Sequence, residues 1–293
     1  MIRKVEYITD SVIALNDPMF PLYIIRGKEQ NYLIDCGISA RAEIFYDKIK
    51  EVVDGEKIDA VLLTHSHYDH TGACSYLQDI FNFEIYGSVR TVELLNKSKV
   101  IEFISKLNQE FNRIENIKHN KFKCSGLKKL TYLHDNETIA IDEVRNLTAV
   151  ETKGHTQCSM SYFLLPDRIL FPGDASGVLE KNGEIKPLFL SSYNKYIESI
   201  NKLITLDAEI LALPHNRFIR GKDKIKRHLE KSITVSDNLK NSILQKLNSG
   251  NDIKAVATNL LPELFTKPTV TGPQEAFKIN LQAMVKTIKK EFC

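Results

Sequence analysis

Apolar residues form two patterns in the first 215 positions of the chain. Some stand in continuous runs, such as Ala60-Val61-Leu62-Leu63, and such runs are typical of buried strands. Others recur at intervals of three and four residues, which is typical of amphipathic helices. The pattern predicts an α/β protein, with strands at 60–63, 83–86, 138–150, 168–171 and 209–213 and helices at 42–53, 74–81 and 191–206.

Two further segments have only the helical pattern. Within residues 90–118, apolar residues at Ile104, Leu107, Phe111 and Ile114 lie on one face of a helix, which predicts a helical insertion. This insertion either packs on the outside of the sheet or caps a site, and the sequence leaves both alternatives open. After residue 215 the pattern is wholly helical, and we expect helices at 222–230, 239–247, 253–260 and 274–289.

Polar side chains that bind metals follow four of the predicted strands, after turns rich in Gly and Pro. The first group is His65-Ser66-His67-Tyr68-Asp69-His70, directly after the strand at 60–63. The others are His155 in Gly154-His155-Thr156, Asp174 after Pro172-Gly173, and His215 after Pro214. Each alone has an ordinary explanation, such as a turn carboxylate or a core histidine. Their repeated position at strand ends instead favours a shared metal site, because neutral imidazoles and carboxylates bind divalent metals.

The order HxHxDH, GHT, GD and PH, together with the turn at Asp35-Cys36-Gly37, strongly resembles the metallo-β-lactamase fold superfamily. The resemblance covers roughly residues 1–220. It implies a four-layer αββα sandwich. We therefore expect a catalytic domain at 1–220 with the helical insertion at about 90–118, and an all-helical C-terminal extension at 221–293.

The resemblance also implies the metal ligands, and all seven of its ligand positions are filled. His65, His67 and His155 would bind one metal, Asp69, His70 and His215 a second, and Asp174 would bridge the two. We expect two divalent ions, with zinc favoured and iron or manganese as alternatives. A hydroxide shared by the metals would be the nucleophile, and Asp69 would orient it or accept its proton. The candidates for orienting these ligands are Asp35, Thr64, Ser66 and Thr156.

The superfamily contains many activities, so the fold does not identify the substrate. We expect a metal-dependent hydrolase of a small thioester, ester, lactone or phosphoester, similar to glyoxalase II in its motifs and helical extension. A zinc β-lactamase is disfavoured, because those enzymes typically have Cys where this chain has Asp174. Two alternatives stay open: an iron-dependent sulfur dioxygenase, and a regulatory or interaction protein that keeps the metal-bound fold.

Charge and composition limit the partners. The net charge of +3 combines a net of −5 over residues 1–215 with a net of +8 over residues 216–293. The basic residues of the tail are dispersed, so we expect them to solvate helices, and nucleic-acid binding is disfavoured. The start of the chain lacks the apolar segment of a signal peptide, no apolar run is long enough to span a bilayer, and the five cysteines lack CxxC spacing. We expect a cytoplasmic protein without membrane contact, and a homodimer is compatible with the sequence.

The insertion and the tail are the elements that could select a substrate, since the metal ligands do not distinguish acyl groups. We expect a partly capped, partly apolar pocket over the metals. Its apolar walls would come from Phe103, Phe111 and Ile114 of the insertion and from Phe265 and Phe277 of the tail.

Overall fold

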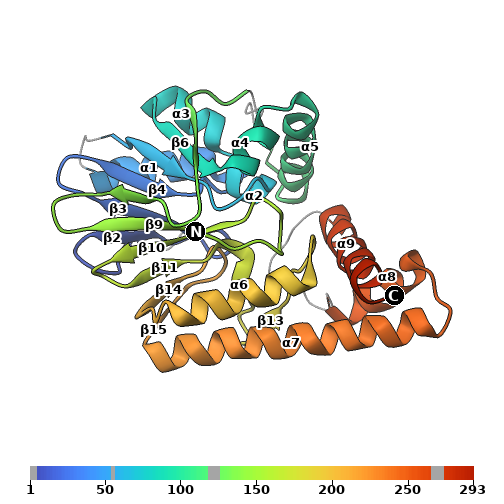
Figure 1. Cartoon of the computed structure of the whole chain (residues 1–293). Helices are drawn as coiled ribbons and strands as arrows, with labels where there is room; N and C mark the ends of the chain where they lie inside the picture. The colour runs from blue at the N-terminus through green and yellow to red at the C-terminus, as the bar shows by residue number, and fades with distance from the viewer. Residues whose placement is uncertain (1–4, 54–56, 118–125, 265–273) are drawn as a thin grey trace.

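A computed structural model describes residues 5–53, 57–117, 126–264 and 274–293. Two β-sheets lie face to face, and helices cover the outer face of each, so that the fold is a four-layer αββα sandwich (Figure 1). The C-terminal helices extend beyond the sheets on one side of the molecule (Figure 1). The fold class is therefore as the sequence predicted.

The first sheet has seven strands in sequence order. They are β1 (Val5–Tyr7), β2 (Val12–Leu15), β3 (Leu22–Arg26), β4 (Asn31–Ile34), β5 (Ala60–Leu62), β6 (Glu84–Ser88) and β7 (Leu130–Leu133). The first four strands pair antiparallel, and β4 to β7 pair parallel. Parallel pairing requires crossover connections, and helices supply those between β4, β5, β6 and β7.

The second sheet has six strands. Their spatial order is β15 (Phe218–Arg220), β14 (Ile210–Ala212), β11 (Ile169–Phe171), β10 (Met160–Leu165), β9 (Asn146–Glu151) and β8 (Thr138–Ala140). Only β11 and β14 pair parallel, and their connection contains a helix. A small hairpin of β12 (Val178–Leu179) and β13 (Ile185–Lys186) follows β11.

The helices fall into two groups. The first sheet is accompanied by η1 (Ser39–Arg41), α1 (Ala42–Val53), α2 (Tyr68–Thr71), α3 (Cys74–Phe81), α4 (Val89–Leu95) and α5 (Ser98–Ile114). The second sheet is accompanied by η2 (Gly173–Ser176), α6 (Tyr193–Thr205), α7 (Lys222–Asn248), α8 (Ile253–Leu264) and α9 (Gln274–Phe292). Helix α9 packs against α6, α7 and α8.

Alternation of side chains along the central strands divides the interior into three apolar cores. In β5 and its continuation, Val61 and Leu63 face the helices of the first sheet, and Ala60 and Leu62 face the other sheet. Strands buried on both faces must be apolar at every position, which explains the continuous runs in the sequence. The third core lies between the second sheet and the C-terminal helices.

The predicted C-terminal helices differ from the structure at one place. The predicted helices at 222–230 and 239–247 are parts of one helix, α7. Residues 231–238 between them contain neither Pro nor Gly, and Ser232 and Ser236 of this segment are buried, so nothing interrupts the helix. The predicted insertion consists of two helices, α4 and α5, while position 118 lies outside the described residues. On α5, Ile104, Leu107 and Phe111 are buried as expected.

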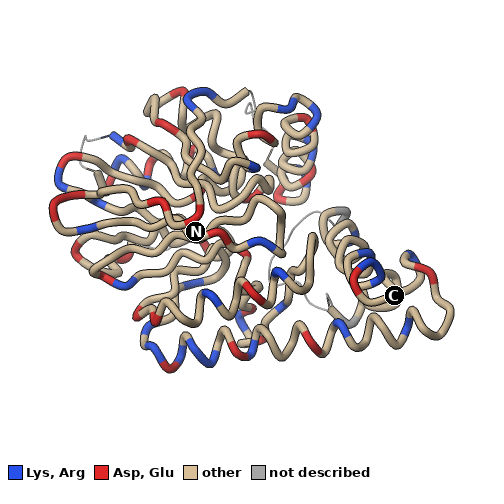
Figure 2. Tube along the Cα trace, in the orientation of Figure 1, with Lys and Arg blue, Asp and Glu red and all other residues tan. Residues whose placement is uncertain are grey.

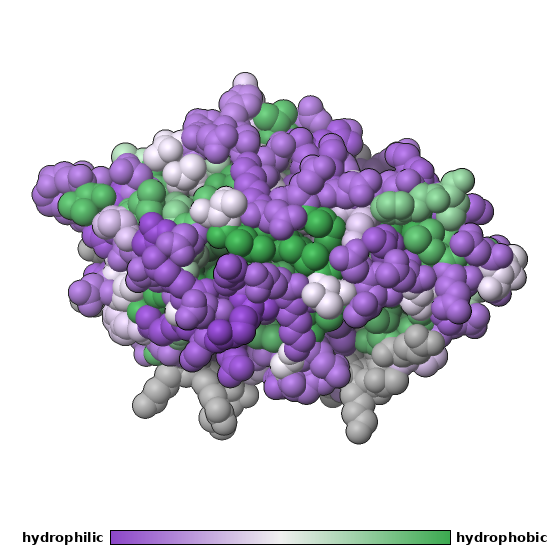
Figure 3. Space-filling view, turned by 60° about the horizontal axis from the view of Figure 1, so that its bottom comes forward, coloured by the Kyte–Doolittle hydropathy of each residue, from purple (hydrophilic) through white to green (hydrophobic). Residues whose placement is uncertain are grey.

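Charged residues are spread over the surface. Lys and Arg are distributed along α7 and alternate there with acidic residues (Figure 2). With the side of α7 turned forward, the surface is mostly hydrophilic and has a band of apolar residues across its middle (Figure 3). Among the described residues, no helix is both long and apolar enough to cross a membrane.

Candidate metal centre

The first group of candidate ligands lies where β5 ends. Leu63 and Thr64 follow the strand, then His65, and the short helix α2 carries Asp69 and His70. The backbone N–H of Cys36 donates to the carbonyl of His70 at 2.8 Å, which ties this loop to the end of β4. The compact HxHxDH segment is therefore held by the two neighbouring parallel strands.

The other three candidates come from the second sheet. His155 follows β9, Asp174 lies in η2 after β11, and His215 follows β14. Gly154, directly before His155, has a φ of +128°, and a Cβ there would lie 2.3 Å from the backbone nitrogen of Tyr196. Only glycine lets this loop approach α6 so closely. The four predicted ligand segments thus converge between the facing sheets.

His65, His67, His155 and Asp174 form one compact cluster. Nε2 of His155 lies 3.2 Å from Nε2 of His65, 3.1 Å from Nδ1 of His67 and 3.3 Å from Oδ2 of Asp174. One ligand atom from each residue lies within 4.8 Å of the others. His65, His155 and Asp174 are buried.

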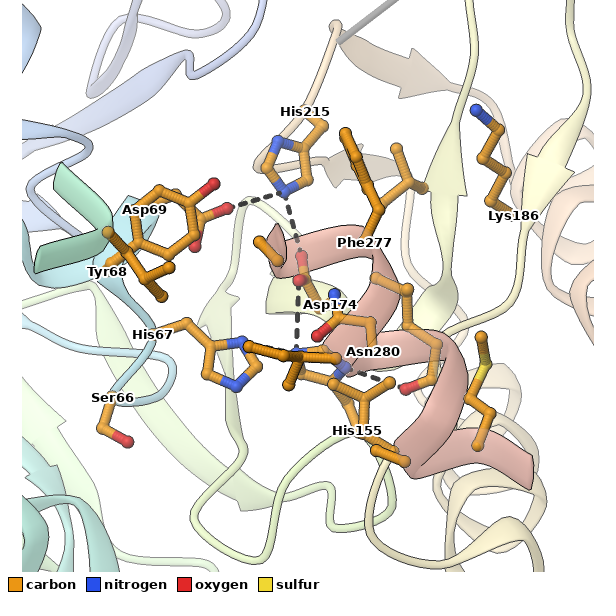
Figure 4. A pocket seen from close by; sticks show the side chains of 18 of the residues that line it. Ser66, His67, Tyr68, Asp69, His155, Asp174, Lys186, His215, Phe277 and Asn280 are labelled. Carbon is orange, nitrogen blue, oxygen red and sulfur yellow. Dashed lines mark hydrogen bonds and ion pairs between the residues drawn. The ribbon is translucent and has the colours of Figure 1, made fainter. Parts of the chain in front are cut away.

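Asp69, His70 and His215 form a second cluster beside the first. Oδ2 of Asp69 lies 4.0 Å from Nε2 of His70 and 3.8 Å from Nε2 of His215. Asp174 lies between the clusters, because its Oδ1 is 3.7 Å from Nε2 of His70 and 3.3 Å from Nε2 of His215 (Figure 4). The structure thus brings together the seven residues that the sequence analysis named, and their role as ligands of two metals stays a prediction.

Hydrogen bonds orient the imidazoles. Nδ1 of His155 lies 2.8 Å from the carbonyl of Leu188, and Nδ1 of His215 lies 3.0 Å from the carbonyl of Met19. A carbonyl only accepts, so each Nδ1 carries a proton and each Nε2 is directed at the cluster. Neutral imidazoles with this tautomer are ready to bind metal.

Asp35 connects the two clusters, because it contacts His70 directly and His65 by way of Thr64. Its Oδ1 accepts from the backbone N–H of Thr64 at 2.7 Å, and its Oδ2 accepts from the Thr64 hydroxyl at 2.8 Å. The same Oδ2 lies 2.8 Å from Nδ1 of His70, while the Thr64 hydroxyl lies 3.1 Å from Nδ1 of His65. Two of the four predicted orienting residues therefore contact ligand imidazoles.

The other two predicted orienting residues do not. Ser66 contacts Cys158, and the Thr156 hydroxyl lies 2.7 Å from the hydroxyl of Ser159. The backbone carbonyls of Leu188 and Met19 orient His155 and His215 instead. The sequence could not predict these partners, because every residue has a backbone carbonyl and the type of side chain does not show which carbonyl accepts a hydrogen bond.

The electrostatics divide the imidazoles into two groups. Burial lowers the pKa values of His65, His67 and His155, and three neighbouring imidazoles lower that of His65 further. Burial alone would also lower those of His70 and His215, but nearby carboxylates outweigh it and raise the pKa of His70 to about 10 and that of His215 above its usual 6.5. Burial by itself would raise the pKa of Asp174, but the charges of His215 and His70 outweigh it and hold that pKa well below its usual value.

The clusters fit divalent metal. Nε2 of His70 and Oδ1 of Asp174 are buried without a hydrogen-bond partner, although buried polar atoms are nearly always paired. Nε2 of His65 and Nε2 of His155 also lie only 3.2 Å apart. A bound cation would satisfy all of these atoms. The donor set of five imidazoles and two carboxylates suits zinc, iron or manganese.

A cavity of about 380 Å³ opens over the clusters, within the usual size range of small-molecule sites. His67, Asp69, His155, Asp174 and His215 contribute to its lining. Its remaining walls come from α4, α5, the β12–β13 hairpin and its continuation, and from α8 and α9. Helices α4 and α5 and the C-terminal helices α8 and α9 thus each supply part of the cavity wall.

The expected apolar walls are only partly those observed. Phe103 of α5 and Phe277 of α9 line the cavity. Phe111 does not, because it is fully buried in the core beneath α5, and Ile114 is exposed at the end of the helix. Phe265 lies outside the described residues. The sequence analysis expected Phe103, Phe111 and Ile114 in this wall, whereas Val100, Phe103, Ile104 and Leu107 of α5 form it.

The cavity lining contains a single Lys or Arg among the described residues, Lys186 of β13. Its Nζ lies 2.7 Å from Oε1 of Glu180, and both side chains are largely buried. In Figure 4 the ammonium of Lys186 lies away from the metal-binding clusters. The cavity therefore offers a substrate little unbalanced positive charge from side chains.

Among the described residues, His134 and His228 lie apart from the clusters. His134 is exposed after β7, and His228 is buried on α7. His119 lies outside the described residues. Cys36, Cys74 and Cys158 are buried free thiols, and Cys293 is an exposed one.

Comparison with known proteins identifies the family. The model of the metallo-beta-lactamase superfamily matches residues 22–215, which contain all seven candidate ligands. This chain belongs to that superfamily. The superfamily fold accounts for the convergence of ligands from both sheets, and residues beyond 215 lie outside the matched region.

Relatives within the superfamily are distant. The metallo-beta-lactamase fold-containing protein ST1585 of Sulfurisphaera tokodaii is 24% identical over 74% of this chain and 79% of its own length. BaeB of Bacillus velezensis, a probable polyketide biosynthesis zinc-dependent hydrolase, is 32% identical over 52% of this chain and 53% of its own length. The structure of the metallo-beta-lactamase family protein TTHA1429 from Thermus thermophilus has a TM-score of 0.69 at 16% identity and covers 97% of this chain and 94% of that one.

Proposed function

We propose that this protein is a hydrolase that uses two divalent metals to cleave an ester or thioester bond of a small molecule. The convergence of seven ligand residues, with two of their ligand atoms buried and unpaired, at a cavity of small-molecule size carries the proposal. His65, His67 and His155 would hold one metal and Asp69, His70 and His215 the other, with Asp174 between them. Zinc is the favoured metal, and the superfamily relative BaeB is named as a zinc-dependent hydrolase.

The contacts indicate a separate role for the metals, for Asp69 and for the groups that orient the imidazoles. Bound divalent metals would supply Lewis-acid chemistry, polarising a carbonyl and lowering the pKa of water. Asp69 lines the cavity and is less buried than Asp174, so its carboxylate is placed to accept a proton from an attacking water. The imidazoles of His70, His155 and His215 are held at Nδ1 by Asp35, Leu188 and Met19, respectively.

The side chains around the cavity favour carbonyl substrates over phosphoesters, so any attraction for a phosphoryl group would come from the bound metals alone. Phosphoryl groups are commonly bound by Arg or Lys, which act directly on the negative oxygens. Here Lys186 is already paired with the buried Glu180. The largely apolar walls instead suit an uncharged ester or thioester.

We further propose that residues 1–220 form the catalytic domain and residues 221–293 an extension that serves it. Helix α9 supports this assignment, because Phe277 and Met284 of α9 line the cavity that His155 and Asp69 also line. The extension therefore contributes to the site even though the superfamily match ends before it.

A substrate panel tests the proposed function. Protein reconstituted with zinc, manganese or iron should be offered p-nitrophenyl esters, acyl thioesters, lactones and phosphoesters, and we expect metal-dependent turnover of esters or thioesters. A protein that holds two metals and cleaves none of these carbonyl substrates would contradict the proposal. Oxygen consumption with persulfide substrates would favour a dioxygenase, and inactivity in both assays would favour a regulatory protein.

A further inference from the structure

We propose that the substrate carries an apolar acyl chain that lies between α5 and α9, and that the Asn280 side chain donates a hydrogen bond to the acyl carbonyl. The inference rests on the proposed function and names its substrate class. In the reaction, the oxygen of water bonds to the carbonyl carbon and the bond to the leaving oxygen or sulfur breaks. The proton taken from water goes to that leaving atom, which leaves as alcohol or thiol.

The walls of the cavity between the two helices are apolar. Val100, Phe103, Ile104 and Leu107 face it from α5. From α9, the lining residues are Ala276, Phe277, Ile279, Asn280, Ala283 and Met284. All but one of these positions are apolar, so the helices offer an acyl chain an almost continuous apolar surface.

Two large apolar side chains at this cavity are exposed in the absence of a ligand. Phe103 of α5 is 47% exposed and Ile279 of α9 is 37% exposed, and both line the cavity. Side chains that gather at a concave site and remain exposed mark a binding surface. An acyl chain between the helices would cover both, and its burial would stabilise the complex by the hydrophobic effect.

Asn280 is the exception on the apolar face of α9. Its side chain extends from the helix into the cavity, on the side of the metal-binding clusters (Figure 4). No described residue makes a hydrogen bond with this amide. Asn280 is half-buried, so an acyl chain that filled the cavity would exclude water from its amide. The amide would then be costly without a partner, and a substrate carbonyl beside the metals would be one.

Helix α9 is fixed in position, so the Asn280 amide can be held in one orientation toward a substrate. The Thr287 hydroxyl donates to the carbonyl of Leu190 at 2.8 Å, and Glu291 accepts from the backbone N–H of Asn194 at 3.1 Å. Met284 and Val285 are buried in the core of the C-terminal helices. A group on a helix held at several points can orient a substrate with little loss of entropy.

Binding of uncharged amides tests the inference separately from catalysis. Butanamide, hexanamide and octanamide present the same carbonyl as an ester but are poor substrates, and their dissociation constants can be measured by titration calorimetry on the zinc-loaded full chain. We expect octanamide to bind about a hundredfold more tightly than butanamide, because each buried methylene adds a similar increment. Equal affinity for all three amides would overturn the acyl-chain site.

Two variants distinguish the contribution of the acyl chain to binding from that of the hydrogen bond to the carbonyl. Phe103→Ser should weaken octanamide about fivefold and leave butanamide unchanged, since only the longer chain reaches the exposed ring. Asn280→Ala should weaken both amides by a similar factor of about 2–10, the range of one hydrogen bond. Tyr132→Ser, an exposed aromatic on β7, and Gln282→Ala, an exposed amide on α9, are the matched controls.

The outcomes distinguish the two proposals. Length-dependent amide binding with no hydrolysis of any ester or thioester would support the acyl site and contradict the hydrolase. Hydrolysis of short esters, together with equal affinity for the three amides, would support the hydrolase and overturn the acyl site. An Asn280→Ala effect no larger than that of Gln282→Ala would overturn the role of the amide.

Discussion

Single residues set the orientation of the metal-binding clusters. Nδ1 of His70 lies 2.8 Å from Asp35 and 3.3 Å from the Thr64 hydroxyl, and Nδ1 of His155 and of His215 each contacts a backbone carbonyl. Their Nε2 atoms then meet Asp174 at 3.3–3.7 Å. A carboxylate this deeply buried stays ionised only because opposite charges surround it.

At this scale, Asp69→Asn should remove most hydrolysis while changing the fold little. The amide has the size of the carboxylate but cannot accept a proton, and it is a weaker metal ligand. We expect turnover of a confirmed ester or thioester to fall about 10²–10⁴-fold, the usual contribution of a positioned acid–base group. Steady-state kinetics measure the loss, and circular dichroism checks the fold.

The control for this variant is His134→Ala, because His134 is exposed and lies apart from the clusters. It should keep the turnover of the natural chain. Comparable activity in both variants would show that Asp69 does not have the proposed role.

Among the elements, α5 is the one most directly fastened to the metal-binding loop. Oδ1 of Asn108 accepts from the backbone N–H of Ser39 at 2.9 Å, and its Nδ2 donates to the carbonyl of Tyr68 at 3.2 Å. Phe20 packs edge-on against both Phe111 of α5 and His215. The wall of the cavity and the ligands beneath it are therefore one packed unit.

Asn108→Ala should destabilise this unit. The change leaves the buried N–H of Ser39 and the carbonyl of Tyr68 without their partner and opens a small cavity beside Gly72. We expect a loss of about 2–3 kcal/mol in the free energy of unfolding, measured by urea denaturation. Gln109→Ala, an exposed amide on the same helix, should change stability by less than about 0.5 kcal/mol. Equal effects of both variants would contradict the fastening role.

At the scale of the whole molecule, the clusters join the two sheets. His65, His67, Asp69 and His70 follow a strand of the first sheet, whereas His155, Asp174 and His215 follow strands of the second. Bound metal would therefore connect layers that otherwise meet through the apolar core between the sheets. Metal binding and folding stability should be coupled.

We accordingly expect two metal ions per chain in elemental analysis after saturation with zinc. Removal by a chelator should lower the midpoint of thermal unfolding by at least about 5 °C, since metal at a hundredfold excess over its dissociation constant adds about 2.7 kcal/mol per site. Differential scanning calorimetry measures this shift. A stoichiometry that never exceeds one would contradict the dinuclear centre, and an unchanged midpoint would contradict the coupling.

The sequence by itself determined the central strands and named the seven candidate residues at their ends, whose role as metal ligands stays a prediction. Continuous apolar runs identified central strands because these strands are buried on both faces. The ligand motifs stood out because each follows a strand end. Their order along the chain was sufficient for the resemblance to the superfamily, which the family comparison confirms.

The tertiary structure decided what the local pattern does not encode. Leu188 and Met19 orient imidazoles through backbone carbonyls, which any residue could supply. Phe103, Phe111 and Ile114 share a helix, yet one lines the cavity, one is buried in the core and one is exposed, because the neighbours of each side chain come from distant parts of the chain. Periodicity tells which face of a helix is apolar, and only packing tells what that face meets.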